Sequence, residues 1–427
     1  MIPITLFPAP LLPRGTSGQQ PLMSEIQLSP YPNCTSKGGY NSCMLPLPVS
    51  DPQWIETADE LAQVITEIAV EPQIAVDTES NSLFVYRERV CLIQISTPSI
   101  DYLIDPLAIH DLSGLAHIFA NPRQLKIFHA AEYDIICLKR DYGFEFAGIF
   151  DTMIAARILG ELQVGLGSLL SSRFNIQLDK RFQRADWGKR PLSNVMLNYA
   201  RMDTHYLFAL KEHFEERLKQ AGLWELALED FSLVSTVQSN AAETNGNSCW
   251  KVSGGTRLDP KQSAILNALC RYRDQQAQKM DLPHFKVMSN QLLLDVAQAA
   301  PRTLAELKQL PGMSERLLHR HGTGLLAAVK AGEYEKPPRR QPRSKPDQAF
   351  MKRLDALREW RKVRGKELKV ESDIILPRDI MESIACENPA DSAALKQLMI
   401  RTPWRYRSYG VSILDTLHQL EEYENTL

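Results

Sequence analysis

The sequence has little that would place it in a membrane or outside the cell. None of its apolar runs approaches the roughly 18 residues that a membrane-spanning helix needs. Its seven cysteines are scattered and include no C-x-x-C pair, which argues against a disulfide framework and against a zinc ribbon. A reducing compartment is the simpler expectation, and we expect a cytoplasmic protein that makes no membrane contact.

The chain also lacks an excess of charge of either sign, since 49 Lys and Arg against 51 Asp and Glu give a net charge of −2. This balance argues against a wholly basic nucleic-acid-binding protein. The average conceals one basic stretch, because Glu335 to Glu371 contains thirteen basic side chains against six acidic ones. Such a stretch could contact phosphates, although a solvated helix face is the simpler explanation of a charge run alone.

At 427 residues the chain is too long for one ordinary hydrophobic core, so two or three domains are expected. Its first 50 residues are rich in Pro, Ser, Gly and Asn, which predicts a disordered or non-native extension. The next part of the sequence contains both strand-like and helix-like runs. After a polar segment, the rest of the sequence has only helical patterns. The expected parts are the extension over 1–50, an α/β domain over 51–230, a linker over 231–256, a helical domain over 257–334, a basic linker over 335–346 and a second helical domain over 347–422.

The α/β domain opens with Thr57-Ala-Asp-Glu60, a capping box that predicts a helix over Leu61–Val70. The strands come first in a meander and then alternate with helices, which indicates a mixed sheet with helices packed on it. The expected strands are Ile74–Val76, Val90–Ser96, Tyr102–Ile104 and Leu125–Phe128, and the expected helices are Leu112–Phe119, Tyr133–Arg140, Thr152–Leu159 and Leu192–Ala221.

The helical part contains an internal repeat, because a shift of 88 residues without a gap superposes many of its side chains. Each copy has about 75 residues, enough for one small helical bundle, so two domains of one fold are expected. The shift places Leu269 on Leu357, Tyr272 on Trp360, Arg273 on Arg361, Pro301 on Pro389, Leu307–Leu310 on Leu395–Leu398 and Gly322 on Gly410.

Two acidic residues follow the first long apolar strand, in Val76-Asp77-Thr78-Glu79-Ser80. Because strand side chains alternate, Asp77 and Glu79 lie on the same face. Carboxylates so close together repel each other, and their hard oxygen atoms suit a divalent cation such as Mg²⁺ or Mn²⁺. Alone, an acidic pair at a strand end is more often ordinary surface than a metal site.

Two further patterns follow in the same domain. In Phe128–Asp134 a strand runs into a helix, and Asp134 falls in the first helical turn, where it could simply complement the helix dipole. The spacing of four between Tyr199 and Asp203 places both on one helical face. Each pattern alone is a weak signal, but all three in this order within one α/β domain indicate a shared acidic site.

In this order the motifs resemble the DEDDy branch of the DnaQ-like 3′-to-5′ exonucleases, and most closely the bacterial ribonuclease D family. The likeness covers residues 51 to about 420, because both helical copies resemble HRDC domains. The implied fold is an α/β RNase H-like domain with a mixed sheet, followed by two all-α HRDC bundles. Other segments that resemble the family are Leu92–Ile95, Tyr102–Pro106, Gly167–Leu170, Asp186–Trp187, Arg190–Ser193 and Tyr199–Leu207.

The resemblance implies an exoribonuclease that hydrolyses RNA from the 3′ end and releases 5′-mononucleotides, with precursor tRNA as the implied substrate. It also implies that Asp77, Glu79, Asp134 and Asp203 hold two divalent ions, Mg²⁺ or Mn²⁺, which activate a water and stabilise the leaving 3′ oxygen. Tyr199 is a poor general base at its ordinary pKa near ~10, so its expected role is to position the attacking water.

Three other residues are candidates for contacts with the terminal nucleotides, namely His129, Leu83 and Gln94. Leu83 and Gln94 could equally be structural, and His129 could equally be a hydrogen-bonded group behind the site. For Trp187 and Arg190 two interpretations stay open: they could stack on a base and bind a phosphate, or they could pack against the helix of Tyr199.

The second repeat carries aromatic residues among arginines, a mixture that suits base stacking and phosphate contact but that a bundle core with a solvated rim produces equally. These residues are Arg401, Trp404, Arg405, Tyr406, Arg407 and Tyr409.

Two alternatives to a monomeric exoribonuclease remain. A DNA-directed or broad-specificity exonuclease would use the same acidic residues, because the site does not distinguish the sugars. A catalytically silent nucleic-acid-binding adaptor would be expected to lack a carboxylate, and none is missing. Digestion of matched RNA and DNA strands discriminates between these readings.

Overall fold

The computed structural model of the protein describes residues 50–238, 258–337 and 347–425. The expected N-terminal extension, except Ser50, lies outside these residues, as do most of both expected linkers. Over the described ranges, no helix is both long enough and apolar enough to cross a membrane.

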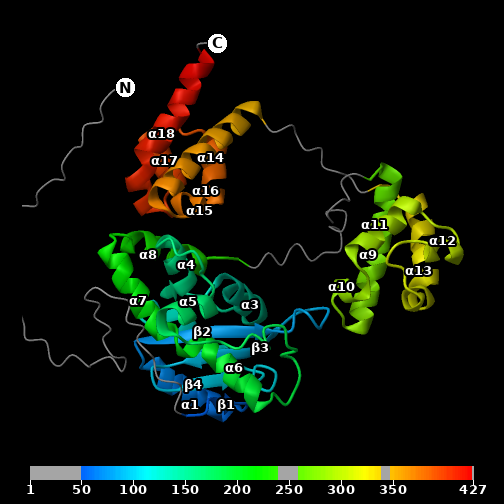
Figure 1. The fold of residues 1–427 in the computed structure, drawn as a ribbon, viewed down its shortest axis with the longest axis horizontal. Coiled ribbons are helices and arrows are strands. Elements are labelled where there is room, and N and C mark those ends of the chain that lie inside the picture. Colours follow the sequence, from blue (N-terminus) through cyan, green and yellow to red (C-terminus); the bar gives the residue numbers. More distant parts are fainter. Residues whose placement is uncertain (1–49, 239–257, 338–346, 426–427) are drawn as a thin grey trace, which may run out of the picture. The chain divides into compact units, whose positions relative to one another are not determined.

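The first described part contains a mixed sheet, which confirms the expectation from the sequence. In the described chain, its strands follow the order β1-β4-β3-β2-β5-β6. β2 pairs antiparallel with β3 and β3 with β4, whereas the other neighbours are parallel. The strands are β1 Gln53–Ile55, β2 Gln73–Ser80, β3 Val90–Ser96, β4 Asp101–Ile104, β5 Leu125–Phe128 and β6 Ile149–Asp151 (Figure 1).

Helices surround this sheet, and the capping box of Thr57 and Glu60 starts the first of them as expected. The single long helix expected over Leu192–Ala221 is instead two helices that meet at Tyr206. The bounds are α1 Ala58–Ala69, η1 Ser113–Leu115, α2 Ala116–Ala120, α3 Glu132–Tyr142, α4 Thr152–Ile158, α5 Leu166–Phe174, α6 Asn194–His205, α7 Leu207–Gln220 and α8 Trp224–Ser235.

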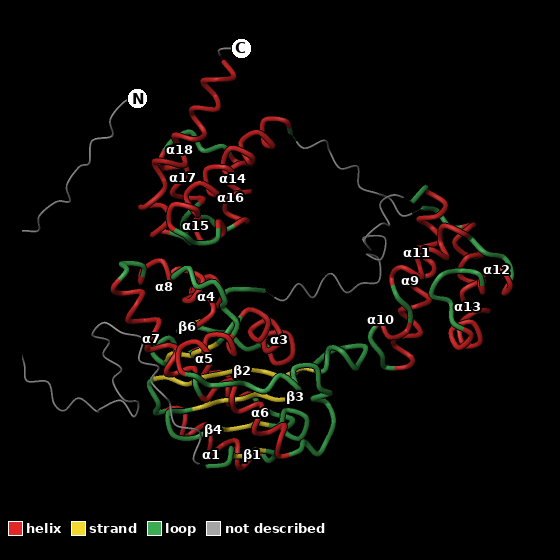
Figure 2. Tube along the Cα trace, in the orientation of Figure 1, coloured by secondary structure: helices red, strands yellow, loops and turns green. Residues whose placement is uncertain are grey.

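Helix α6 packs on the central strands β2, β3 and β4, and Figure 2 shows it lying against the yellow strands. Two buried contacts fix it there. The hydroxyls of Ser96 on β3 and Thr204 on α6 are 2.7 Å apart, and the Arg201 guanidinium donates to the buried Asp101 carboxylate at 2.6 Å. Because these partners lie on different elements, the rotation of α6 over the sheet is fixed, and with it the direction of Tyr199 and Asp203.

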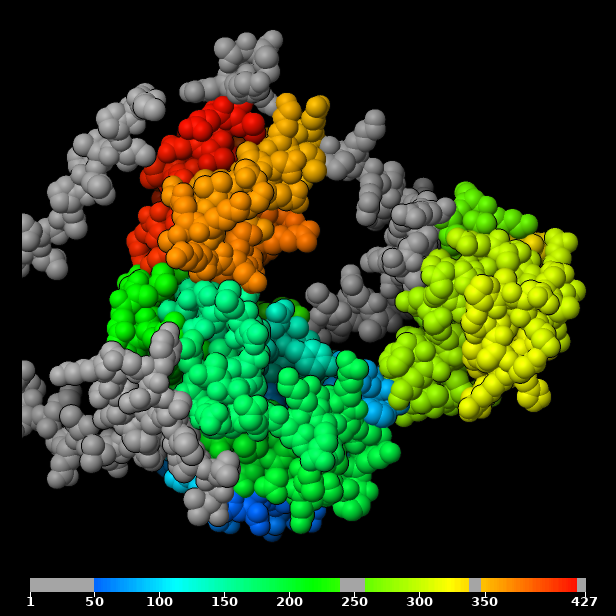
Figure 3. Space-filling model, viewed as in Figure 1, coloured from blue at the N-terminus to red at the C-terminus, as the bar shows by residue number. Residues whose placement is uncertain are grey.

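In the space-filling view, side chains from α4, α5 and the following residues, coloured teal to green, form most of this face of the domain (Figure 3). The strands drawn in Figure 2 are largely hidden beneath them. Access to the acidic residues therefore depends on a hollow between these elements.

The two helical copies each form a bundle with its own hydrophobic core, as the repeat predicts. Leu269 and its counterpart Leu357 are both fully buried, as are Leu307 and Leu395. The first bundle has α9 Pro260–Met280, α10 His284–Val287, α11 Asn290–Ala299, α12 Leu304–Lys308 and α13 Glu315–Tyr334. The second has α14 Gln348–Leu368, α15 Ser372–Ile375, α16 Arg378–Glu387, α17 Ser392–Leu398 and α18 Pro403–Asn425.

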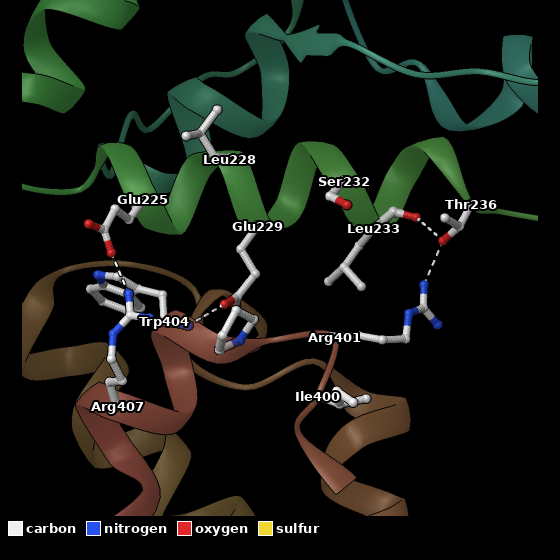
Figure 4. A pocket seen from close by; sticks show the side chains of 11 residues that line it. Glu225, Leu228, Glu229, Ser232, Leu233, Thr236, Ile400, Arg401, Trp404 and Arg407 are labelled. Atoms are coloured by element: carbon white, nitrogen blue, oxygen red, sulfur yellow. Dashed lines mark hydrogen bonds and ion pairs between the residues drawn. The ribbon is translucent and has the colours of Figure 1, made fainter. Parts of the chain in front are cut away.

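Helix α8 was not predicted, and it carries the first residues of the expected linker, because the helix continues to Ser235. It contacts the start of α18 (Figure 4). The Arg405 guanidinium is buried between two carboxylates of α8, 2.6 Å from Glu229 and 2.7 Å from Asp230. Glu229 also accepts the backbone N–H of Trp404 at 2.7 Å, so it caps a helix of another domain.

These contacts favour the bundle-core interpretation of the aromatic and basic residues near Trp404, which the sequence left open beside RNA contact. Arg405 is fully buried, and the rings of Tyr406 and Tyr409 pack on the core of the second bundle. A hollow of about 540 Å³ lies beside Trp404, and Glu225 and Glu229 line it together with Arg401 and Arg407. Its charged side chains balance each other, so the hollow offers no net positive charge to a phosphate.

Among the cysteines that the structure describes, three are free. Cys91 and Cys137 are buried thiols and Cys386 is an exposed one. Cys270, in contrast, is disulfide-bonded, which its position in the sequence did not predict.

Candidate active site

Strand β2 delivers the first two acidic residues. Its apolar half, Ile74 to Val76, is completely buried, and the chain reaches the pocket only at Asp77. Alternation then places Asp77 and Glu79 on one face, beside the register partners Gln94 and Leu92 of β3. The expected pair therefore lies at the end of the central, buried strand.

The turn from β5 into α3 delivers His129 and Asp134. Ala130 has a left-handed backbone with φ of 65°, which bends the strand abruptly into the helix. The Asp151 carboxylate holds this turn by accepting the N–H groups of Ala130 at 3.1 Å and Ala131 at 2.7 Å. Asp134 then sits in the first turn of α3, buried, where its carboxylate accepts a hydrogen bond of 2.5 Å from the Thr78 hydroxyl of β2.

Helix α6 delivers Tyr199 and Asp203, one turn apart, to the same place. Both side chains line a hollow of about 370 Å³ together with Asp77 and His129. The remaining lining residues come from the start of α5 and from the segment after it: Gly165, Leu166, Gly167, Ser168, Leu178, Asp179, Lys180 and Gln183.

Burial raises the pKa of all four carboxyl groups, and the charges of neighbouring carboxylates add to it. Burial is the largest cause in each case, and it raises the pKa of both Asp134 and Asp203 to about 7. The pKa of Asp77 is raised well above its usual value by burial and by the charges of Asp134, Asp203 and Glu79, and that of Glu79 by burial, Asp203 and Asp134. Four carboxyls that disfavour one another's charge in this way need a cation or protons.

The donor set suits divalent metal ions of the Mg²⁺ class, because all four side chains offer hard carboxylate oxygens. Over the described ranges, however, no three His, Cys, Asp or Glu side chains stand as a ready-made metal-binding group. Asp77 and Asp203 line the same hollow, and the Thr78 hydroxyl of β2 donates to one oxygen of Asp134.

The Tyr199 hydroxyl is held in its protonated form. Burial, followed by the charges of Asp203, Glu79 and Asp77, raises its pKa far above the ordinary value of 10.0. The group can therefore hydrogen-bond to a water molecule but does not act as a base near neutral pH.

The three candidates for nucleotide contacts are placed differently. His129 lines the hollow, and its Nδ1 is 2.8 Å from the Thr152 hydroxyl, while burial lowers its pKa so that the neutral ring is favoured. Leu83 is 38% exposed in the turn after β2, but it does not line the hollow. Gln94 is completely buried, so a direct nucleotide contact by its side chain does not fit this structure.

Sequence reasoning missed the polar residues that follow α5. Lys180 and Gln183 line the hollow, and Lys180 brings a cation to an otherwise acidic wall. They lie a few residues before the Asp186–Trp187 motif, and this position is the only hint that the sequence offers. A lone Lys and a lone Gln in a loop have no spacing pattern that marks them from sequence alone.

Comparison with known proteins agrees with this site. Residues 52–219 match the 3′-5′ exonuclease family, and residues 262–329 and 350–417 each match the HRDC domain. The chain therefore combines a DnaQ-like 3′-5′ exonuclease domain with HRDC domains.

Individual relatives fall into two groups. The chain is 29% identical over 373 residues to ribonuclease D of Nitrobacter hamburgensis, covering 85% of this chain and 94% of that protein. It is 32% identical over 292 residues to the exosome complex component 10 homolog of Caenorhabditis elegans, covering 67% of this chain but only 33% of that protein. The crystal structure of Escherichia coli RNase D, described as an exoribonuclease involved in structured RNA processing, matches with a TM-score of 0.64 at 25% identity, over 87% of this chain and 99% of that one. The resemblance to ribonuclease D noted from the motifs is thus confirmed.

Proposed function

We propose that the protein is a 3′-to-5′ exoribonuclease that hydrolyses single nucleotides from RNA 3′ ends and releases 5′-mononucleotides. The observation that carries this proposal is the meeting of Asp77, Asp203 and Tyr199 in one hollow, beside Glu79 on the same face of β2 and Asp134, which is hydrogen-bonded to Thr78 of β2. Five residues from β2, α3 and α6 are thus gathered within a domain that matches 3′-5′ exonucleases.

DnaQ-like exonucleases generally use divalent metal ions. For this chain we propose that Asp77, Glu79, Asp134 and Asp203 hold two such ions, Mg²⁺ or Mn²⁺. When bound, these ions would supply the charge that activates the attacking water and stabilises the leaving 3′ oxygen.

The protein's own residues then have separate tasks. The protonated Tyr199 hydroxyl orients the attacking water by a hydrogen bond. Neutral His129 and the Lys180 ammonium, which both line the hollow, contact the terminal nucleotide and its phosphate. Leu83 contributes an apolar contact from the turn after β2. Gln94, buried beside Asp77 on β3, supports that residue without touching the nucleotide.

For the substrate we propose the 3′ tail of precursor tRNA, degraded by a monomer in the cytoplasm. The support is the similarity to ribonuclease D over most of both chains. We further propose the division into an exonuclease domain over residues 51–230, with α8 as its C-terminal extension, and HRDC domains over 257–334 and 347–422.

A digestion experiment tests the proposal. A 5′-labelled RNA with a short 3′ tail is incubated with the protein and Mg²⁺ or Mn²⁺, next to a DNA strand of the same sequence. Shortening from the 3′ end with release of 5′-mononucleotides, abolished by chelation and by Asp77→Asn, is expected. Preferential degradation of the DNA strand would favour the alternative DNA-directed exonuclease, and no degradation would favour the adaptor.

A further inference from the structure

The ring of Tyr199 packs against two other aromatic rings, which belong to one short segment, Leu178 to Arg190. The Trp187 ring lies 5.9 Å from it between centroids, tilted by 33°. The Phe182 ring meets it edge-on at 5.7 Å. Because a tyrosine ring turns about only two side-chain torsions, packing against two other rings restricts where its hydroxyl points.

Trp187 is itself fixed, and the group that fixes it is Arg190. The guanidinium donates to both carboxylate oxygens of Asp105, each at 2.6 Å, and Asp105 follows β4 directly. It also donates to the carbonyl of Cys91 on β3 at 2.7 Å and to the carbonyl of Trp187 at 2.8 Å. Arg190 thus ties the backbone of Trp187 to two strands of the sheet.

This arrangement decides between the two interpretations that the sequence left open. A fifth bond, to the Lys189 carbonyl at 2.8 Å, occupies the last of the five N–H donors of Arg190. Trp187 is only 1% exposed, so it cannot stack on a base. Both residues therefore serve the interior of the domain.

The indole of Trp187 is not simply a filler of apolar space. Its buried Nε1–H has no hydrogen-bond partner among the described residues. A buried donor without a partner costs free energy that a phenylalanine or leucine at the same place would not incur. What the indole offers and phenylalanine or leucine does not is a wider ring surface against Tyr199.

We propose that Trp187, anchored by the Arg190–Asp105 pair, is a positioning residue that sets the Tyr199 hydroxyl in the active-site hollow. The inference rests on the proposed function, because it acts through Tyr199. The same segment lines the hollow with Lys180 and Gln183, so the anchor also keeps these side chains beside the site.

A double-mutant cycle in the full-length protein tests the proposal. Single-turnover hydrolysis of a short single-stranded RNA with Mg²⁺ is measured for the parent protein, Trp187→Phe, Tyr199→Phe and the double variant. Trp187→Phe is expected to slow the chemical step about 10-fold, with little change in the RNA concentration at half-maximal rate. In the Tyr199→Phe background the same substitution is expected to change nothing further, because the hydroxyl it positions is gone.

Matched variants separate positioning from general support of the fold. Trp224→Phe changes a tryptophan that packs against Phe150, away from the hollow, and should leave the rate unchanged. Arg190→Lys keeps the charge but loses the paired contact with Asp105. It should slow hydrolysis as Trp187→Phe does, and it should have no further effect in the Tyr199→Phe background. Arg190→Lys replaces Trp187→Phe in the cycle if that variant does not fold.

The outcomes are distinct. If the losses of Trp187→Phe and Tyr199→Phe multiply in the double variant, or if Trp187→Phe has the parent rate, the positioning role is overturned. If Tyr199→Phe alone has the parent rate, the catalytic role of Tyr199 under the proposed function is the part that fails.

Discussion

At the residue scale, the ionised form of Asp77 is disfavoured by burial and by three neighbouring carboxylates, which together raise its pKa. Asp77→Asn should remove hydrolysis by a factor too large to measure and leave the fold intact, because an amide of equal size relieves that repulsion. Digestion assays combined with a melting curve check both halves. A variant that stays fully active with metal would remove the assignment of the site.

Tyr199→Phe deletes one hydroxyl and keeps the ring packed against Trp187 and Phe182. We expect turnover to fall by about 10²-fold while the increase in melting temperature on adding Mn²⁺ is retained, because the hydroxyl orients water and does not bind metal. Single-turnover rates and thermal unfolding measure the two effects. A lost Mn²⁺ response would instead place the hydroxyl among the metal ligands.

The raised pKa of the carboxyls predicts how pH acts on the metal-free protein. Folding raises the pKa of Asp134 and Asp203 from 3.8 to about 7, so folding favours their protonated forms. Their contribution to stability is complete below about pH 4 and declines as the pH rises to about 7. Mn²⁺ should therefore raise the melting temperature more at pH 7.5 than at pH 5, because protons compete with it at the lower pH.

Thermal unfolding in chelator and in Mn²⁺ at both pH values checks this expectation. Asp203→Asn is the control and should reduce the difference between the two pH values. An equal Mn²⁺ effect at pH 5 and pH 7.5 would contradict it.

The catalytic side chains were predictable at this scale because their spacing follows backbone periodicity. The period of two in β2 placed Asp77 with Glu79, and the period of 3.6 in α6 placed Tyr199 with Asp203. Gln94 shows what periodicity cannot predict. The period of two gives the face of β3 on which Gln94 lies, but it does not reveal that α6 packs on β3 and that the Gln94 side chain is completely buried. Partners distant in the sequence, such as Arg190 and Asp105, have no such period.

At the element scale, the contact of α8 with α18 combines one buried and one exposed ion pair. Arg405 and Glu229 have side chains that are 1% and 3% exposed, whereas Arg407 and Glu225 pair at 60% and 65% exposure. Arg405→Met should destabilise the protein by about 3 kcal/mol, because Glu229 and Asp230 would be left buried without their partner. Arg407→Ala, the matched control, should cost at most about 1 kcal/mol.

The urea midpoint of each variant measures these differences. Adding Glu229→Met to the Arg405→Met protein should recover part of the loss, because only Asp230 is then left without its cationic partner. Equal effects of the Arg405 and Arg407 substitutions would show that burial does not govern this contact.

Elements were predicted well where an apolar period was long, and poorly where it was short or where two helices adjoin. The runs that became β2, β3, β4 and β5 were found, while the three-residue strands β1 and β6 were not. α8 was missed because its apolar residues face two partners. Phe231 packs on Phe150 of β6, and Glu229 faces α18, so no single apolar stripe appears.

At the scale of the whole molecule, the HRDC domains are expected to hold structured RNA while the exonuclease domain cuts it. A truncation near Phe231 would remove the last turn of α8, where Val234 is buried, so the cut belongs after Val237. The shortened protein should still hydrolyse short single strands but bind 3′-tailed, structured RNA more weakly. Its affinity should also depend less on salt, because fewer phosphate contacts release fewer counterions.

Binding isotherms at a series of salt concentrations compare the two proteins. Glu229→Met in the shortened protein is a control for the acidic surface that the cut exposes. Equal affinity and an equal salt slope with and without the HRDC domains would show that these domains serve a partner other than RNA.

The cap that Glu229 places on α18 makes the two repeats differ in what holds their last helix. In the first copy, the equivalent helix α13 is capped by its own Ser314, and the counterpart of Arg405 is Leu317, which packs against that copy's core. A leucine there cannot form the ion pairs that join α18 to α8. The start of α18 therefore depends on a side chain of the exonuclease domain, whereas the start of α13 is capped within its own bundle.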